Sequence, residues 1–564
     1  MMTASQHLWR RDLWPARRRT RLIKGHAGET LFDGSHHGPP DGAVEYPVRA
    51  QPRLSRRRVL SGSVASLALP WVLRGARAAA KEPFACDVSD AAWKDLANKI
   101  TCGVVQRPGD PWFLALTQPE NLRYYNPPAT ADAPRDPDAP LGVVLPCNPQ
   151  EVAASIRWAK DVGLPMVPRS GGHSYAGCST IPGLVIHAGF MRNVMYANGL
   201  LEVEGGALNS DIFAALRAVN RSIVHGRCHA VGVSAYIMGG GIGLAMRDYG
   251  LGCDQVDSVE LVLASGETKT VQASATDPLD KDLFWAVCGG GGGNLGFVTK
   301  WSLGTQPADN VVAFKASWKK FGKEQEIFTK LVRALEPSSK GMGAQVSIFA
   351  RPSSHEANEV TLTGQLRGNM DEFQHIIGPI FAPIFRDDEP ESQSILRLPY
   401  WLAQDFLDIT VVPNRYQETS VFADQLTDDF IAETFKLLRT WPGTVKKKPR
   451  VTFFLMGGHV NEIKPGATAF VHRSSQWLVN PALDWTENDN QSDIAYNLKW
   501  QRDLQNGLAS CLRGGGSYQN FPDPELDNHA KAYWGANYRR LADVKLRIDP
   551  DLAFTPPRNQ GITP

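Results

Sequence analysis

The sequence predicts an α+β protein built from two unlike halves, and three observations lead to this prediction. The chain has 564 residues, beyond the roughly 250–300 residues at which a single hydrophobic core stops growing. Between residues 140 and 306, short apolar segments alternate with amphipathic helices and glycine-rich loops. After about residue 305, longer alternating strands and amphipathic helices follow without glycine runs. At least two globular units are therefore expected.

The overall composition excludes some partners. Hydrophobic residues make up 43% of the chain and charged residues 21%, with a formal net charge of +2. A nucleic-acid-binding protein would show a clear basic excess. We therefore expect no nucleic-acid partner.

The first eighty residues read as an export signal. Arg56–Arg58 lie within a twin-arginine pattern, a modestly apolar run covers residues 59–73, and small residues end at Ala80. The apolar run is shorter than the ~20 residues of a membrane-spanning helix, so no stable membrane span is expected. We predict export of the folded protein by the twin-arginine machinery, cleavage near Ala80, and a periplasmic or secreted location. The alternative is a basic tail.

The eight cysteines show no C-x-x-C pair and no metal-like spacing with histidine, so no metal site is expected. An oxidising compartment permits a disulfide. Cys86 and Cys102 are the local candidates for that bond.

The segment from residue 141 to 177 predicts a strand, a helix, a second strand and a glycine loop. Asn148 is the expected helix N-cap, Pro149 takes the first helical position, and Glu151 would complete a capping box. The helix should run through Val162, before the strand at residues 166–169. This order of elements suits a nucleotide-handling unit.

Two more glycine-rich stretches follow, at residues 226–249 and 282–299. Glycines leave the backbone almost bare, so a large or anionic ligand can approach it closely. The run Gly291-x-Gly293-x-x-Gly296 matches a dinucleotide fingerprint in form, yet it precedes a strand where the fingerprint opens a helix. A nicotinamide site is therefore not expected, and a phosphate cradle is favoured over a flexible linker.

Three motifs carry a family resemblance: RSGGHSYAG at 169–177, GRCHAVG followed by GGGIGLAMRDYGLGCDQV at 226–256, and DLFWAVCGGGGGNLGFVT at 282–299. The chain resembles the berberine-bridge-enzyme-like branch of the vanillyl-alcohol-oxidase and p-cresol-methylhydroxylase (PCMH) flavoproteins. The resemblance implies a PCMH-type FAD-binding domain of two α/β subdomains, with a substrate domain whose antiparallel sheet is flanked by helices. The implied boundaries are 1–80 for the signal and extension, 81–306 for the FAD-binding domain, 307–510 for the substrate domain, and 511–564 for a C-terminal segment returning to the FAD-binding domain.

The resemblance also implies how the cofactor is held. In the family, the histidine of SGGHSYAG is joined to the 8α-methyl group of FAD and the cysteine of GxCxxVG to ring carbon C6. The matching residues are His173 and Cys228, so a bicovalent FAD is expected, and Cys178 is the competing thiol. The other implied cofactor-binding residues are Arg169, Ser170, Gly171, Gly172, Ser174, Gly177, Gly232, Gly239, Gly240, Gly241, Gly243 and Asn520.

The C-terminal segment implies a catalytic residue. Tyr518 of a Y-x-N pattern matches the tyrosine that some carbohydrate- and polyketide-oxidising members use as a base, and Asn520 would support the flavin or the loop. A phenol has an unperturbed pKa near ~10 and needs a neighbour to help it accept a proton. The alternative is a core tyrosine with a satisfied hydroxyl. Val231 resembles the small residue that admits oxygen in related oxidases, or it is an ordinary core valine.

The substrate half is expected to form an antiparallel sheet with helices on one face, while its other face covers the flavin. Its predicted strands are 344–350, 359–366, 451–456 and 476–480, and its predicted helices are 324–335 and 427–438. Five aromatic residues either line a substrate groove or belong to the core: Tyr400, Trp401, Phe406, Trp477 and Trp485. Possible polar substrate contacts are Arg450, His459, His472 and Arg473.

Together these features predict an exported FAD-dependent oxidase. It would remove hydride from an alcohol carbon of a sugar, oligosaccharide or polycyclic natural product, with O2 reduced to H2O2. One alternative is a flavin dehydrogenase with another electron acceptor. A second is a non-catalytic flavin-containing protein that binds a glycan.

Overall fold

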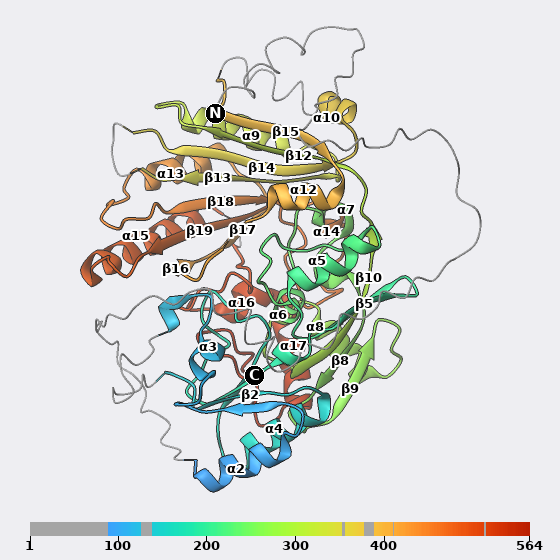
Figure 1. Cartoon of the computed structure of the whole chain (residues 1–564). Helices are drawn as coiled ribbons and strands as arrows, with labels where there is room; N and C mark the ends of the chain where they lie inside the picture. Colours follow the sequence, from blue (N-terminus) through green and yellow to red (C-terminus); the bar gives the residue numbers. More distant parts are fainter. Residues whose placement is uncertain (1–87, 126–137, 352–355, 377–387, 410, 513–514) are drawn as a thin grey trace, which may run out of the picture. The chain divides into compact units, whose positions relative to one another are not determined.

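The computed structural model describes residues 88–125, 138–351, 356–376, 388–409, 411–512 and 515–564, all within one unit of the chain, 48–564. The predicted twin-arginine signal and Cys86 lie outside the described residues. Three sheets organise the described part (Figure 1).

The first sheet has four strands in the order β1 (Val104–Gln106), β2 (Gly142–Leu145), β4 (Leu184–His187) and β3 (Met166–Arg169). Strands β2, β4 and β3 are parallel, and β1 is antiparallel to β2. Helix α4 (Pro149–Asp161) connects β2 to β3 and packs against α2 (Asp90–Lys99) in one apolar core. The buried apolar runs of β2 and β4 are typical of parallel strands covered on both faces.

The second sheet is antiparallel, with the strand order β5 (Val194–Ala197), β6 (Leu200–Glu204), β10 (Phe297–Gly304), β8 (Val256–Val262) and β9 (Thr268–Gln272). A turn at Ser265–Gly266 joins β8 to β9. Helices α5 (Asn209–Ala218) and α8 (Pro278–Val287) bury their apolar faces in the same core as this sheet.

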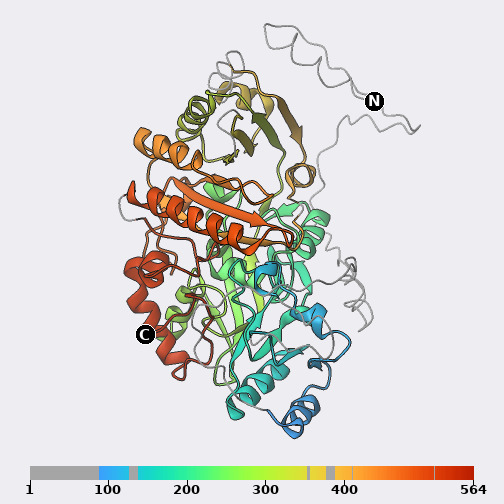
Figure 2. The same ribbon diagram turned by 90° about the vertical axis from the view of Figure 1, so that its left-hand side faces the viewer.

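The third sheet is larger and wholly antiparallel. Its order is β15 (Ser392–Leu398), β12 (Val311–Trp318), β14 (Glu359–Arg367), β13 (Met342–Phe349), β18 (Arg450–Leu455), β19 (Trp477–Trp485) and β16 (Arg415–Glu418), and β17 (Val421–Ala423) also pairs with β19. Helices α9 (Glu324–Leu335), α13 (Asp428–Leu438) and α15 (Gln491–Ser510) share one apolar core with this sheet. Figure 2 shows the orange helix α13 and the orange-red helix α15 side by side against the sheet. The predicted strands and helices of this half are confirmed, with ends shifted by a few residues.

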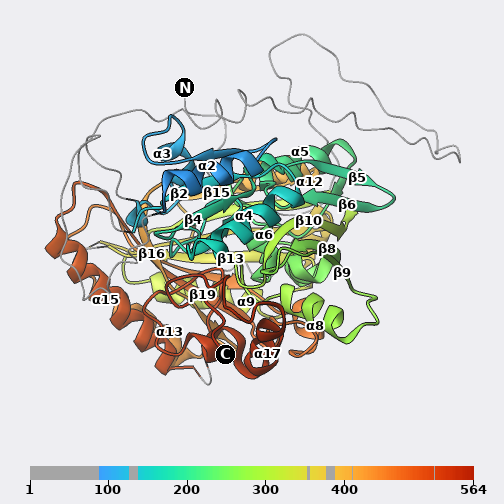
Figure 3. The same ribbon diagram turned by 90° about the horizontal axis from the view of Figure 1, so that it is seen from below.

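The C-terminal segment packs against the first half of the chain. Helices α16 (His529–Trp534) and α17 (Tyr538–Ile548) form it, and α17 packs against α8 (Figure 3). The fully buried ammonium of Lys545 in α17 donates to the Asn294 carbonyl at 2.6 Å and to the Asp549 carboxylate at 2.6 Å. This lysine fastens the segment to the end of the third glycine loop.

The remaining elements are short. They are α3 (Phe113–Thr117), η1 (Leu122–Tyr124), η2 (Ala188–Phe190), β7 (Arg221–Ser222), α6 (Val233–Met238), α7 (Met246–Tyr249), η3 (Gly252–Gln255), β11 (Gln306–Pro307), α10 (Met370–Ile376), α12 (Tyr400–Leu407), α14 (His459–Glu462) and η4 (Gly535–Asn537). Across the described ranges we find no helix whose length and hydropathy would let it span a bilayer.

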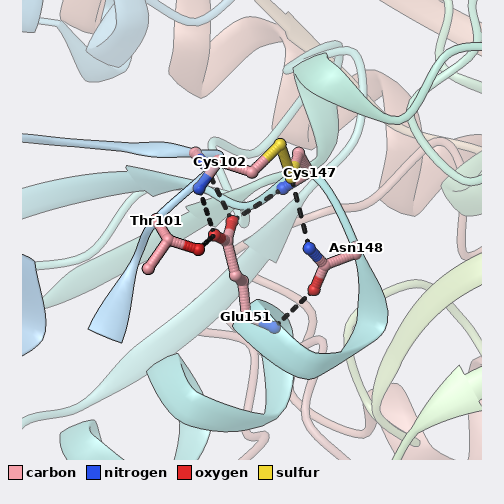
Figure 4. Close-up of a disulfide and its surroundings, with 6 residues drawn as sticks. Thr101, Cys102, Cys147, Asn148 and Glu151 are labelled. Carbon is pink, nitrogen blue, oxygen red and sulfur yellow. Dashed lines mark hydrogen bonds between the residues drawn. A yellow bond between two sulfur atoms is a disulfide. The ribbon is translucent and has the colours of Figure 1, made fainter. Parts of the chain in front are cut away.

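Two predictions near the start of α4 were wrong. The disulfide joins Cys102 to Cys147 and not to Cys86, because the antiparallel pairing of β1 with β2 brings these two strand ends together (Figure 4). Asn148 does cap α4, since its Oδ1 accepts from the Glu151 amide at 2.9 Å. The Glu151 carboxylate, however, accepts from the amides of Cys102, Gly103 and Cys147 at 2.6, 3.0 and 3.1 Å, so it closes the disulfide loop and forms no capping box.

Candidate active site

A cavity of about 560 Å³ lies between the glycine-rich loops and the large sheet. Residues 170–175, 226–246 and 292–293 contribute to one wall, strands β13, β16, β18 and β19 to another, and residues 518–522 to a third. This volume is in the usual range for a ligand site, roughly 300–1,000 Å³. Distant segments of the chain thus meet around one space.

Ten of the fifteen predicted site residues line this cavity. They are Ser170, Gly171, Gly172, His173, Ser174, Cys228, Gly232, Gly243, Tyr518 and Asn520. The five others, Arg169, Gly177, Gly239, Gly240 and Gly241, do not contribute to the lining.

His173 and Cys228 face each other across two loops. Their Nε2 and Sγ atoms lie 3.4 Å apart, within hydrogen-bonding distance. Burial lowers the pKa of His173 to about 4 and raises the pKa of Cys228, so both side chains are uncharged near neutral pH. The structure therefore brings together, at one point of the wall, the two side chains that the sequence predicted to hold the cofactor.

Cys178, the competing thiol, also lines the cavity. Its amide donates to the Ser174 hydroxyl at 3.0 Å, and burial raises the pKa of its thiol. Of the two cysteines, Cys228 is the one whose sulfur lies at hydrogen-bonding distance from the His173 ring.

The loops that carry His173 and Cys228 touch through backbone. A Cβ on Gly171 would overlap the Gly232 amide nitrogen, and a Cβ on Gly232 would overlap that of Gly171. Two glycines are thus required for the loops to approach this closely. The wall next to them includes Gly226, Gly243, Gly292 and Gly293, where bare backbone lets a phosphate-bearing ligand approach closely.

Carboxylates lining the described part of the cavity occur only at Glu418 and Asp484, on the large sheet. The glycine-loop side therefore offers no negative charge that would repel a diphosphate. Such a lining fits FAD, and His173 and Cys228 are the side chains that would hold it by the prediction from the sequence.

Arg169 has a supporting place in the structure. Its guanidinium is buried and donates to the carbonyls of Leu116, Thr117 and Gln118 at 3.0, 3.0 and 2.6 Å. It anchors α3 beneath the His173 loop and contributes nothing to the main cavity wall. The sequence could not show this, because the three acceptors are backbone atoms some fifty residues away.

The glycines at 239–241 lie behind the wall, where they support the C-terminal segment. The Gly241 amide donates to the Tyr518 hydroxyl at 3.0 Å, and a Cβ on Gly239 would overlap the Asn520 side chain. Gly177 instead packs against the Tyr124 ring.

Tyr518 is almost wholly buried, and its hydroxyl oxygen accepts from the Gly241 amide and from Asn520 Nδ2, at 3.0 and 3.1 Å. Burial raises the pKa of Tyr518, while the two donated hydrogen bonds oppose that rise by favouring the phenolate. Asn520 also donates to the Tyr236 carbonyl at 3.0 Å, so it supports the tyrosine and the loop together.

The sheet face toward the cavity is polar, and Arg450 was the only one of its lining residues predicted from the sequence. Its lining side chains include Gln345, Tyr416, Glu418, Arg450, Thr452, Asn480 and Asp484. Alternation along β18 was the available signal, since Val451 and Phe453 enter the apolar core while Arg450 and Thr452 face the cavity.

Glu418, Arg450 and Asp484 form a charged triad on this face. Glu418 and Arg450 both lie opposite Ala482 of β19, whose small side chain lets them meet across it. The guanidinium donates to Glu418 Oε1 and to Asp484 Oδ2, each at 2.8 Å. Burial raises the pKa of Glu418, although Arg450 opposes this. One negative charge remains uncompensated within the triad.

For the five aromatic residues considered for a groove, the structure shows the core alternative. Tyr400, Trp401, Trp477 and Trp485 are buried core residues, Phe406 packs partly buried against the same core, and none contributes to the cavity wall. The lining aromatics are Tyr175, Tyr236, Tyr416, Phe454, Tyr518 and Phe521. Of the four possible polar contacts, Arg450 lines the cavity, whereas His459, His472 and Arg473 do not.

Within the described part of the chain, no group of three or more histidine, cysteine, aspartate or glutamate side chains is arranged to hold a metal ion.

Comparisons with known proteins agree with this geometry. A family model described as an FAD binding domain matches residues 140–272, and one described as berberine and berberine like matches residues 517–562. The carbohydrate oxidase of Microdochium nivale is 28% identical over 471 residues, which covers 76% of this chain and 91% of the relative. The aclacinomycin-N/aclacinomycin-A oxidase of Streptomyces galilaeus is 27% identical over 455 residues, covering 72% and 82%.

Among solved structures, berberine bridge enzyme from Eschscholzia californica matches with a TM-score of 0.73 at 21% identity, over 84% of this chain and 99% of that chain. At this sequence identity the match shows similarity of fold alone.

Fold and cavity together define an FAD-linked oxidoreductase with the PCMH-type α+β fold. Within that class, the C-terminal segment is similar to berberine-like proteins, and the relatives of the chain include proteins named as FAD-linked oxidoreductases and oxidases. The predicted fold class is confirmed, and so is the predicted resemblance to berberine-bridge-enzyme-like proteins.

Proposed function

We propose that this protein holds FAD through both His173 and Cys228, and oxidises an alcohol carbon of a sugar unit with O2 as the electron acceptor. The observation that carries the proposal is the 3.4 Å approach of His173 Nε2 to Cys228 Sγ in the cavity wall. FAD, when bound, supplies the hydride acceptor, and attachment at two points raises its reduction potential.

Tyr518 is the proposed base. Its hydroxyl lies at the cavity wall with two N–H donors on the oxygen, so the phenolate form has two hydrogen-bond partners already in place. In that form it accepts the hydroxyl proton of the substrate as hydride leaves the neighbouring carbon.

The polar sheet face supports a sugar substrate. A sugar ring presents several hydroxyl groups, each of which donates and accepts a hydrogen bond. The carboxylates of Glu418 and Asp484 accept such bonds, while the Tyr416 hydroxyl, which is buried without a partner among the described atoms, can donate or accept one. Relatives named carbohydrate oxidase and glucooligosaccharide oxidase support this assignment.

Molecular oxygen is the proposed acceptor. Val231, three residues after Cys228, lines the cavity and is half-buried. Its small side chain leaves more room beside the attachment point than a leucine would. A reduced protein that reoxidises slowly in air would instead make the chain a dehydrogenase.

Export into an oxidising compartment is the proposed location, by the twin-arginine route. The disulfide between Cys102 and Cys147 supports it, because such bonds persist where thiols are not kept reduced. Mass spectrometry of the mature protein tests it. An N-terminus near residue 81 is expected, and full-length protein retained in the cytoplasm would contradict it.

The first test is acid precipitation of the purified protein, with His173→Ala and Cys228→Ala in parallel. We expect the yellow colour to stay with the precipitated wild type and with each single variant, and to leave the double variant. Colour released from the wild type would overturn covalent attachment. A folded, colourless protein would overturn FAD binding itself.

A further inference from the structure

We propose that helix α12, which belongs to the substrate half, positions Cys228 for its attachment to the flavin. This inference rests on the bicovalent attachment proposed above. It makes Tyr400 and His225 positioning residues, neither of which needs to touch substrate or cofactor.

The loop 225–229 carries the contacts. His225, Arg227 and His229 reach the region of α12, and Gly226, Arg227 and Cys228 line the cavity. The residues directly before and after Cys228 are thus held by the substrate half, which restricts the positions that its sulfur can take beside His173.

Each of the three contacts has a defined partner. The His225 ring lies 2.8 Å from the Tyr400 hydroxyl, Arg227 donates to the Leu407 carbonyl at 3.3 Å, and His229 Nε2 lies 3.9 Å from the Asp408 carboxylate. Arg227 also donates to Gln345 Oε1 of β13 at 2.7 Å. The substrate half therefore holds the loop at its beginning, middle and end.

The His225–Tyr400 bond is the most enclosed of these. His225 Nδ1 lies 2.7 Å from the Gly226 carbonyl, which can only accept, so Nδ1 carries the hydrogen and Nε2 is left to accept from the Tyr400 hydroxyl. The His225 ring also stacks on Trp401 at 5.7 Å and 10°. Burial lowers the pKa of His225 to about 4, which keeps the ring in this neutral form.

Helix α12 is itself fixed against the first half of the chain. Trp401 Nε1 donates to the Arg221 carbonyl at 3.1 Å, and Asp405 pairs with Arg217 of α5 at 2.6 Å. In Figure 1, α12 lies between the large sheet and α5. A rigid helix can therefore transmit the position of the substrate half to the Cys228 loop.

His173 is held by other contacts. In its loop the Ser170 hydroxyl donates to the Gly205 carbonyl at 2.8 Å, and the Gly172 carbonyl accepts from the Glu120 amide at 3.0 Å. Neither bond involves α12. Loss of the α12 contact should therefore reduce attachment through Cys228 while attachment through His173 continues.

The attachment itself is an oxidation. A thiol S–H and a ring C–H are exchanged for one C–S bond, so two protons and two electrons leave. O2, the acceptor of the proposed function, takes both and becomes H2O2. The positions of Tyr400 and His225 affect how often the sulfur is aligned for this exchange.

The test is Tyr400→Phe in the full-length holoprotein, with Tyr538→Phe as matched control. Both substitutions remove one hydroxyl that has a hydrogen-bond partner, but Tyr538 bonds to the Thr563 carbonyl outside the cavity wall. Denatured protein is alkylated and digested with trypsin, which releases residues 170–192 and 228–247 as two peptides. A bicovalent flavin joins them, whereas attachment through His173 alone leaves Cys228 alkylated.

We expect the alkylated 228–247 peptide to be scarce in the wild type and in Tyr538→Phe. Loss of one hydrogen bond should raise it about fivefold in Tyr400→Phe. His225→Phe, which keeps an aromatic ring beside Trp401, should raise it at least as much. The flavin on residues 170–192 should remain in every variant, which a general loss of folding would not allow.

Three outcomes decide the inference. Unchanged attachment in both variants, with a bicovalent wild type, overturns the positioning role alone. Equal loss of both attachments also overturns it, since the effect would then be one of overall stability. A fully alkylated Cys228 in the wild type overturns the bicovalent attachment and this inference with it.

Discussion

The surroundings of Tyr518 have two opposite effects on the ionisation of its phenol. Burial raises its pKa, while the Gly241 amide and Asn520 stabilise its anionic form. The phenolate form of Tyr518 therefore becomes more abundant as pH rises. At neutral pH its low abundance limits the rate of proton transfer from the substrate.

The first prediction concerns this phenol. Tyr518→Phe should slow flavin reduction by the proposed substrate by roughly 10²–10⁴. In the wild type the reduction rate should rise with pH between about 6 and 9, because the raised pKa keeps most of the phenol protonated there. Anaerobic stopped-flow absorbance measures both, with Tyr538→Phe as control. An unchanged rate in Tyr518→Phe would remove this residue from the mechanism.

The second prediction concerns the triad. Glu418→Gln and Asp484→Asn should each raise KM for a sugar substrate by about tenfold, since each removes a charged hydrogen-bond acceptor. Because burial raises the pKa of Glu418, its carboxylate is lost as pH falls, and KM of the wild type should rise on acidification. Steady-state kinetics check this. Glu487→Gln, a change at an exposed position, should leave KM unaltered.

At the scale of secondary-structure elements, the disulfide and Glu151 tie strand β1 to the start of helix α4. The bond closes a loop of 45 residues in sequence, and Glu151 satisfies three amides beside it. Together they hold the edge of the parallel sheet below the His173 loop.

The third prediction follows from this loop. Replacing Cys102 and Cys147 by serine should lower the free energy of unfolding by about 3–4 kcal/mol, through the greater freedom of the unfolded chain. Denaturant unfolding measures the change. Cys511→Ser, at an exposed free thiol, is the control. An unfolding midpoint equal to that of the wild type would show that the disulfide does not form in solution.

At the scale of the whole molecule, several histidines are held neutral inside the fold. Burial lowers the pKa of His225 and His472 to about 4 and that of His187 to about 3. In the unfolded chain these rings take up protons near pH 6.5. Between about pH 6.5 and 4, the unfolded state therefore binds more protons than the folded state.

The fourth prediction is acid destabilisation in that range. Each buried histidine should remove up to ~1.4 kcal/mol of stability per pH unit as pH falls below about 6.5. Denaturant unfolding at pH 7.5, 6.0 and 5.0 should show a steadily lower midpoint, with the exposed His375→Gln variant following the same curve. A midpoint independent of pH would contradict the neutral, buried state of these rings.

The α+β fold class, the periodic strands and helices, and the loops that carry His173, Cys228 and Tyr518 could be predicted from the sequence. These features depend on local patterns: the spacing of apolar residues, glycines where the backbone must be bare, and short motifs typical of one family. Which side chains contact one another, by contrast, depends on the tertiary structure.

Strand register placed Arg450 between two carboxylates and joined Cys102 to Cys147. Packing between the two halves places Tyr400 and Trp401 in the core and not in a groove. Arg169 lies outside the cavity wall because its guanidinium binds backbone carbonyls about fifty residues away in the chain. Such pairings join residues far apart in the chain, and their energies depend on geometry that no local pattern records.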